Sequence, residues 1–328
     1  MSEPSKIPSR ALVADIGGTN ARFAIADLVT LELAAIRSFA VADHPTLAEA
    51  VSYYLKDIKE IAEPLHAAVA VAAPVTSDEI KLTNAPWSFT TGDLVRDAGL
   101  AGVHVLNDFE ALSLSLPHLV ETELHQIGGG DPVAYGTKAV LGPGTGLGVA
   151  GLVWSGTHWV AMPGEGGHVT LGAEDARELE LIERLRRGRE RLSVERALSG
   201  PGLSDLHQAV AASYGHGDEP LTPVEVEMRA LAGDDPLAAE ALDIFVTWLG
   251  RFAGDVALVL GARGGVYLGG GIAPKLVSRL AQGDFRDAFE RKGRMTEFVA
   301  PIPVYVILAE YPALTGAAAG LRAKLASH

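Results

Sequence analysis

The sequence predicts an α/β protein, because short β-prone runs alternate along its length with segments of helical spacing. The β-prone runs at residues 11–16 and 21–28 flank a Gly-Gly turn, which predicts a hairpin. Residues 46–61 place their apolar side chains on one face of a helix. With 328 residues, the chain is long enough for about two domains.

The remaining elements follow from the same signals. Apolar runs ended by Gly, Pro or polar residues predict strands, and apolar faces at helical spacing predict helices. A charged run at residues 174–196 places Glu180 and Arg184, and Glu183 and Arg187, at i,i+4 spacing, which predicts a solvated helix face. The expected strands are 66–73, 103–106, 138–141, 147–154 and 304–308, and residues 264–272 are expected to carry a strand into the turn at 269–271. The expected helices are 109–116, 237–261 and 315–326.

A strand, a Gly/Thr-rich turn and a second strand occur twice, about 125 residues apart. The first turn is residues 17–20 and the second is residues 142–146. This pattern indicates either a weak internal repeat or two unrelated hairpins.

Composition excludes several classes of function. Lys and Arg total 27 against 41 Asp and Glu, and this net charge of −14 disfavours nucleic acid and anionic membranes as partners. The chain has no cysteine, which excludes disulfides, Cys-ligated zinc, iron–sulfur clusters and thiol catalysis.

Residues 1–10 are polar and are expected to form a disordered tail without a secretory signal. The longest stretch without a charged residue, 139–164, contains seven glycines and two prolines, so a membrane helix is not expected there. We therefore expect a cytoplasmic protein.

No P-loop motif is present, which argues against a P-loop NTPase. The glycine-rich turn at 142–148 does not by itself complete a G-x-G-x-x-G motif, which argues against a dinucleotide dehydrogenase. The segment from Asp15 to Asn20 is a candidate phosphate site, because glycines let backbone N–H groups approach an anion and Thr19 adds a hydroxyl. Asp15 is placed to hold Mg²⁺ through water. The alternative is a plain hairpin turn with a solvated aspartate, and Arg22 faces either phosphate or solvent.

Two further glycine turns are candidates for nucleotide binding. The turn Gly144-Thr145-Gly146 offers a second phosphate cradle, and Gly269-Gly270-Gly271 leaves room for a base or ribose against the backbone.

Asn107 and Asp108 follow an apolar strand and precede a helix, where ligands collect in open α/β folds. Asp108 is a candidate general base for a hydroxyl, and Asn107 a hydrogen-bonding partner for a neighbouring one. The alternative is that Asp108 only caps the helix.

Glu165 and His168 lie in a Gly/Pro-rich loop, and Glu195 follows further along the chain. The loop argues against a helical metal pair, and zinc is not expected. Two carboxylates and an imidazole suit a polyhydroxylated ligand.

Together these motifs resemble the bacterial glucokinases of the hexokinase class, in the actin-like, Hsp70-like sugar kinase superfamily. The resemblance runs from about Ala11 to Leu325, and the segments that carry it are 15–22, 106–109, 142–148, 163–168, 193–196, 198–203 and 269–271. It implies a two-domain actin-like (ribonuclease H-like) ATPase fold with a central cleft. The implied small domain comprises 11–117 and 309–328, and the implied large domain 118–308.

The resemblance also implies the roles of individual residues in transferring the γ-phosphoryl of MgATP to the 6-hydroxyl of glucose, the first step of glycolysis. Asp108 is the implied catalytic base, and a homodimer is common in the family. The implied sugar ligands are Asn107, Asp108, Glu165, His168, Glu195 and Asn84. The implied nucleotide contacts are Ala14, Asp15, Ile16, Gly17, Gly18, Thr19, Gly144, Thr145, Gly146, Gly269, Gly270 and Gly271, with Asp15 near Mg²⁺.

Several alternatives stay open at this point. Another hexose or an N-acetylated amino sugar could be the acceptor, and polyphosphate or ADP could be the donor. Related sugar kinases also carry a Glu-Gly-Gly-His-like segment, but there the His binds zinc together with a cluster of cysteines. Because this chain has no cysteine, His168 is not expected to belong to such a zinc site. Two alternatives come from other functional classes: a sugar sensor of weak activity, and an actin-like filament or chaperone ATPase.

Overall fold

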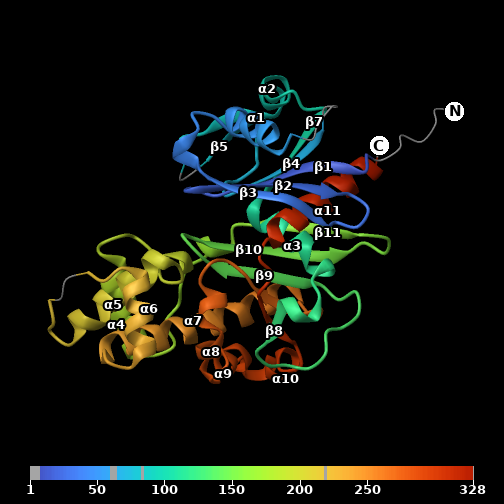
Figure 1. Cartoon of the computed structure of the whole chain (residues 1–328). Coiled ribbons are helices and arrows are strands. Elements are labelled where there is room, and N and C mark those ends of the chain that lie inside the picture. The colour runs from blue at the N-terminus through green and yellow to red at the C-terminus, as the bar shows by residue number, and fades with distance from the viewer. Residues whose placement is uncertain (1–7, 60–64, 83–84, 218–219, 328) are drawn as a thin grey trace. The chain divides into compact units, whose positions relative to one another are not determined.

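A computed structural model describes residues 8–59, 65–82, 85–217 and 220–327 (Figure 1). The chain divides by its internal contacts into two units. The first unit comprises Met1–Val120 and Ala309–His328, and the second comprises Glu121–Leu308.

The first unit is built on a five-stranded sheet with the order β3-β2-β1-β4-β7. β1 pairs antiparallel with β2 and parallel with β4, so the predicted hairpin is confirmed. β1 begins at Arg10, so the expected disordered tail ends earlier than predicted; residues 1–7 lie outside the described residues. The strands are β1 (Arg10–Ile16), β2 (Asn20–Asp27), β3 (Leu33–Ala40), β4 (His66–Val71) and β7 (Gly102–Asn107), and a small separate sheet pairs β5 (Glu79–Lys81) with β6 (Ser88–Thr90).

Alternating apolar side chains of this sheet fill two cores, one on each face. Leu12, Ala14 and Ile16 of β1 pack in one core with α1 (Leu47–Ile58) and α2 (Thr91–Ala98). Ala11 and Val13 pack in the other with α3 (Asp108–Ser115) and α11 (Pro312–Ala326). The unit is therefore a three-layer α/β/α arrangement.

The second unit repeats this topology. Its six-stranded sheet has the order β11-β10-β9-β12-β13-β8. Apart from β8, the order and the parallel or antiparallel sense of each pairing match those of the first sheet. The two hairpins therefore hold the same place in two similar sheets, which favours the internal repeat over unrelated hairpins. The strands are β8 (Leu124–Gln126), β9 (Lys138–Pro143), β10 (Leu147–Trp154), β11 (Trp159–Gly164), β12 (Val266–Leu268) and β13 (Val304–Ile307).

The long helix α7 (Pro236–Leu260) forms the centre of the second unit's core, as its apolar face predicts. α5 and α6 pack against α7, and α9 packs along it (Figure 1). The other helices of this unit are α4 (Ala176–Arg186), α5 (Gly200–Ser213), α6 (Pro223–Ala232), α8 (Val277–Leu280), α9 (Asp284–Glu290) and α10 (Thr296–Val299). Among the described residues, no helix is both long and apolar enough to cross a membrane.

One predicted charge pair is wrong. Glu180 and Arg184 do pair at 3.0 Å, but α4 ends at Arg186, and Glu183 pairs with Arg186 instead of Arg187. Arg187 follows the helix in the left-handed conformation and pairs with Asp205.

Candidate functional site

In the first unit, a tight turn joins β1 to β2, where the backbone N–H of Gly17 donates to the carbonyl of Asn20 at 3.0 Å. Thr19 and Asn20 are exposed on this turn. A side chain at Gly17 would meet only ordinary contacts, so packing alone does not require glycine there. The turn therefore offers accessible backbone N–H groups and a hydroxyl, as an anion site needs.

Asp15 lies directly before this turn and is paired in register with Arg22 of β2. The Arg22 guanidinium lies 3.2 Å from the Asp15 carboxylate, so Arg22 faces Asp15, a partner that was not expected from the sequence. Burial raises the pKa of Asp15, and the charge and hydrogen bond of Arg22 oppose this rise.

Asn107 ends β7, and Asp108 is the first residue of α3. The cap of this helix is Asn107, whose side-chain oxygen accepts from the backbone N–H groups of Phe109 and Glu110. The alternative that Asp108 serves only as the cap is therefore wrong. The Asn107 amide nitrogen donates to the carbonyl of Ala73 at 3.3 Å, so the polar atoms of its side chain hold β7, the helix start and a neighbouring loop together.

The position of Asp108 changes its acidity. The pKa of Asp108 is raised from 3.8 to about 6, mainly by burial and also by the Asp15 carboxylate, whereas the hydrogen bond from Phe109 N–H acts in the opposite direction. Its Oδ1 accepts that hydrogen bond at 2.9 Å. A carboxylate with a pKa near neutrality suits a general base.

In the second unit, two of the predicted glycine turns lie against each other. A Cβ at Gly142 would lie 2.4 Å from the backbone of Gly269, and one at Gly270 would lie 2.6 Å from the carbonyl of Pro143. Gly270 also has a φ of +76°, which favours glycine. Thr145 is exposed at the tip of its turn, and Gly270 and Gly271 are exposed beside it. These contacts place the two candidate nucleotide segments side by side.

The second unit also brings Glu165, His168 and Glu195 together. The segment 166–168 forms a single 3-10 turn where a loop was predicted. Nε2 of His168 lies 3.8 Å from the Glu165 carboxylate, and Nδ1 lies 3.9 Å from that of Glu195. These distances exceed hydrogen-bond length, and the side chains of His168, Glu165 and Glu195 are exposed by 54%, 62% and 28% respectively, so all three are open to a ligand.

Glu195 also links this set to the turn at Gly144–Gly146. Its Oε2 accepts from the backbone N–H of Leu147 at 2.9 Å. A Cβ at Gly146 would lie 2.5 Å from the same oxygen, and one at Gly167 would lie 2.1 Å from the carbonyl of Leu147. The glycines therefore permit the close contact between the two segments.

Some residues of this region were not expected from the sequence. Arg191 donates to the carbonyl of His168 at 2.7 Å, although its charged run suggested only a solvated face. The spacing Asn107-x-x-Glu110 is a capping-box signal that would have identified the true cap. Asn84, a predicted sugar contact, lies outside the described residues, and no cluster of three or more metal-ligating side chains occurs within them.

Comparison with known proteins points to one family. The family model Glucokinase matches residues 12–324. A glucokinase of Aromatoleum aromaticum is 50% identical over 315 residues, which cover 96% of this chain and 95% of the relative. The crystal structure of a glucokinase from an Antarctic psychrotroph is 35% identical with a TM-score of 0.86, covering 96% of this chain and 99% of that one.

A ROK family glucokinase from Streptomyces griseus, in complex with glucose and AMPPNP, shares the fold. Its TM-score is 0.65 at 17% identity, with coverage of 94% of this chain and 98% of that one. The predicted actin-like sugar kinase fold is thus confirmed. Since the family model and the relatives cover nearly the whole chain, the chain belongs to the glucokinase family.

Proposed function

We propose that the chain transfers the γ-phosphoryl group of ATP to the 6-hydroxyl of D-glucose, giving glucose 6-phosphate and ADP. Family membership supports the reaction. The observation that carries the mechanism is Asp108, a carboxylate at the end of a buried strand whose pKa is raised to about 6. Such a group is ionised at neutral pH and accepts a proton readily.

Asp108 acts as the general base in the proposed reaction. Its carboxylate accepts the proton of the sugar hydroxyl as the bond from that oxygen to phosphorus forms and the bond from phosphorus to the leaving ADP breaks. Asn107 contributes by holding the start of α3 through its cap, which orients the Asp108 side chain. The hydrogen bond from Phe109 N–H to Oδ1 holds the same carboxylate from the other side.

Glu165, His168 and Glu195 bind the sugar hydroxyls. Carboxylate oxygens accept from hydroxyls, and the imidazole both donates and accepts. Oε2 of Glu195 is used by Leu147 N–H, which leaves Oε1, the oxygen nearer to His168, for the sugar. Asn84 remains a proposed contact of the same ligand.

The turns at Gly17–Thr19 and Gly144–Gly146 bind the phosphates, with Ala14 and Ile16 beside the first turn, and Gly269–Gly271 binds the adenosine. The exposed hydroxyls of Thr19 and Thr145 and the neighbouring backbone N–H groups are suited to phosphate oxygens. Mg²⁺ bound with ATP would neutralise charge that develops on the phosphates. Asp15 fits it as a hard oxygen donor, and a single carboxylate is consistent with an ion held through water.

Further parts of the proposal rest on family membership and composition. We place the protein in the cytoplasm, at the entry of glucose into glycolysis, and as a homodimer. The acidic net charge and the absence of cysteine are compatible with this.

A panel of acceptors tests the proposal. ADP release is measured with ATP and Mg²⁺ against glucose, mannose, fructose, N-acetylglucosamine and no sugar. Strong turnover with glucose is expected, with little without sugar. Strong turnover with only one of the other sugars would mean that this sugar, and not glucose, is the substrate. Absence of sugar-dependent turnover with ATP, polyphosphate and ADP alike would refute the kinase proposal in favour of a sensor.

A further inference from the structure

The segment 169–175 connects the 3-10 turn that carries His168 to the start of α4. Val194 N–H donates to the carbonyl of Val169 at 2.9 Å, and Leu171 N–H donates to that of Leu192 at 3.0 Å. The strand-like pairing therefore joins this segment to residues 192–194, which lead directly into Glu195. A shift of the segment would displace His168 and Glu195 together.

The underside of the segment is incompletely packed. A cavity of about 550 Å³ lies between α7, β10, β11 and residues 169–174, and its walls include Val149, Met162, Trp248 and Phe252. Leu171 is buried in the core of the second unit, but residues 169, 170 and 172–174 are exposed and border the cavity, so dispersion supports them weakly.

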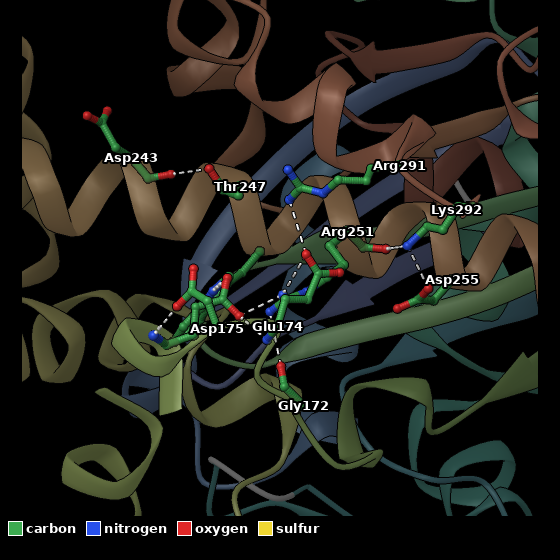
Figure 2. Close-up of polar contacts among 11 residues, drawn as sticks. Gly172, Glu174, Asp175, Asp243, Thr247, Arg251, Asp255, Arg291 and Lys292 are labelled. Carbon is green, nitrogen blue, oxygen red and sulfur yellow. Dashed lines mark hydrogen bonds and ion pairs between the residues drawn. The ribbon is translucent and has the colours of Figure 1, made fainter. Parts of the chain in front are cut away.

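Polar contacts from Arg251 of α7 hold the segment instead (Figure 2). One guanidinium nitrogen donates to the carbonyl of Gly172 at 3.1 Å. The other donates to Glu178 of α4 at 2.7 Å and lies 3.4 Å from the Glu174 carboxylate. Arg251 thus contacts the segment at two residues and the following helix at a third, and Arg291 also donates to the Glu174 carboxylate, at 3.1 Å.

The surroundings fix Arg251 and Glu178 in place. The second oxygen of Glu178 accepts from the indole N–H of Trp248 at 2.9 Å, and the oxygen that binds Arg251 also accepts from the Glu174 N–H at 2.7 Å. Lys292 donates to the backbone carbonyl of Arg251 at 2.8 Å (Figure 2). The side chains of Arg251 and Glu178 are 9% and 13% exposed, so water screens their attraction little.

We infer that Arg251 is a positioning residue for glucose binding, which acts through the segment 169–175 on His168 and Glu195. The inference rests on the proposed sugar role of Glu165, His168 and Glu195. Arg251 itself touches no reacting group. Its function is to keep the sugar-binding side chains at their spacing where the cavity leaves the segment, apart from the buried Leu171, with little packing beneath it.

The expected effect of Arg251→Gln is a rise in the KM for glucose of about ten- to a hundredfold, because small misplacements of binding groups cost that much. We expect kcat and the KM for ATP to change by less than about threefold, because weakening the ground state and the transition state equally raises KM and leaves kcat unchanged. Arg251→Lys keeps the ion pair with Glu178 but loses the forked donor geometry, so an intermediate KM is expected.

Arg286→Gln is the matched control. Arg286 is also largely buried, at 12% exposed, and donates to the backbone carbonyls of Ile302 and Ala300 at 2.9 and 2.6 Å. It tests whether loss of any buried arginine clamp in this unit has the same effect. Its KM for glucose is expected to stay within about twofold of wild type, even where its melting temperature falls.

The experiment measures the KM for glucose, the KM for ATP, kcat and the melting temperature of the full chain and these variants, together with Glu165→Gln. A rise in the glucose KM in Arg251→Gln but not in Arg286→Gln supports the inference. Equal glucose KM values in Arg251→Gln and wild type, or equal rises in both arginine variants, overturn it. If Arg251→Gln does not fold, an unchanged glucose KM in Arg251→Lys overturns it and a raised one supports it. A normal glucose KM in Glu165→Gln would instead refute the sugar site itself.

Discussion

Replacing Asp108 by Asn is expected to remove most of the turnover and, at the same time, to make the folded chain more stable. The loss of turnover follows from the loss of a general base, which costs about 10²- to 10⁴-fold in kcat. Glucose binding should stay within about tenfold of wild type, because the amide keeps the size and one acceptor oxygen of the carboxylate. A gain in stability from the loss of a charge would show that Asp108 is held in an unfavourable environment.

The magnitude of the gain follows from the raised pKa. Folding moves the pKa of Asp108 from 3.8 to about 6, so the folded state binds the proton more tightly than the unfolded state. The free energy of unfolding therefore falls as the pH rises from about 4 to about 6, and the full cost remains above that range. About two pKa units correspond to about 3 kcal/mol, which Asp108→Asn should recover at pH 7.5.

Urea denaturation at pH 7.5 and pH 4 measures this effect, with ADP release and glucose binding measured on the same samples. The difference between variant and wild type should shrink toward pH 4, where Asp108 is protonated in the folded state. Asp93→Asn is the control, because Asp93 also lies in the first turn of a helix, but hydrogen bonds from Thr90 and Arg96 lower its pKa. Its replacement should not raise stability. An Asp108→Asn variant with near-normal turnover, or no more stable than wild type at pH 7.5, would refute the reasoning.

Three further predictions concern Asp108, Gly167 and Gly316. The acidic limb of kcat/KM should have an apparent pKa near 6 and fall about tenfold per pH unit below it, because protonated Asp108 cannot accept a proton; a flat profile from pH 5 to 8 would contradict this. Gly167→Ala should raise the KM for glucose at least about tenfold, because a Cβ at this position would lie 2.1 Å from the Leu147 carbonyl. Gly172→Ala is the control: a Cβ there would meet no atom within 4 Å, so the KM for glucose should stay within about twofold of wild type. Gly316→Ala should lower the free energy of unfolding by about 3 kcal/mol or more, because a Cβ there would lie 1.7 Å from the Ala111 carbonyl of α3. Urea denaturation measures this, with Gly320→Ala as the control. A Cβ at Gly320 would meet only side chains, at 3.1 Å or beyond, so its free energy of unfolding should stay within about 1 kcal/mol of wild type.

Local signals predicted the parts of the fold that depend on neighbours in sequence. The hairpin around Gly17 and the helix α7 are confirmed because alternation, turn residues and an apolar face specify them within a short window. β3 and β11 were not predicted, because their exposed and partly buried residues give no clear alternation. The error at Arg187 has a similar cause, since spacing alone does not tell where α4 ends.

Other features of the site could not be predicted from the sequence, because they depend on contacts between residues that are distant along the chain. The partners of the Arg251 guanidinium, Glu178 and Gly172, lie more than 70 residues away, so no spacing rule connects them. The raised pKa of Asp108 depends on burial and on Asp15 in a different strand. Asn107 and Glu110 form the exception, because their capping spacing is visible in the sequence itself.

The most direct test of the central claim is phosphorus NMR of ATP, Mg²⁺ and glucose incubated with the full-length chain. We expect one phosphomonoester, glucose 6-phosphate, formed in equal amount to ADP, and almost none with Asp108→Asn. Release of inorganic phosphate at a rate independent of sugar would contradict the claim and would indicate an ATPase of the filament or chaperone type.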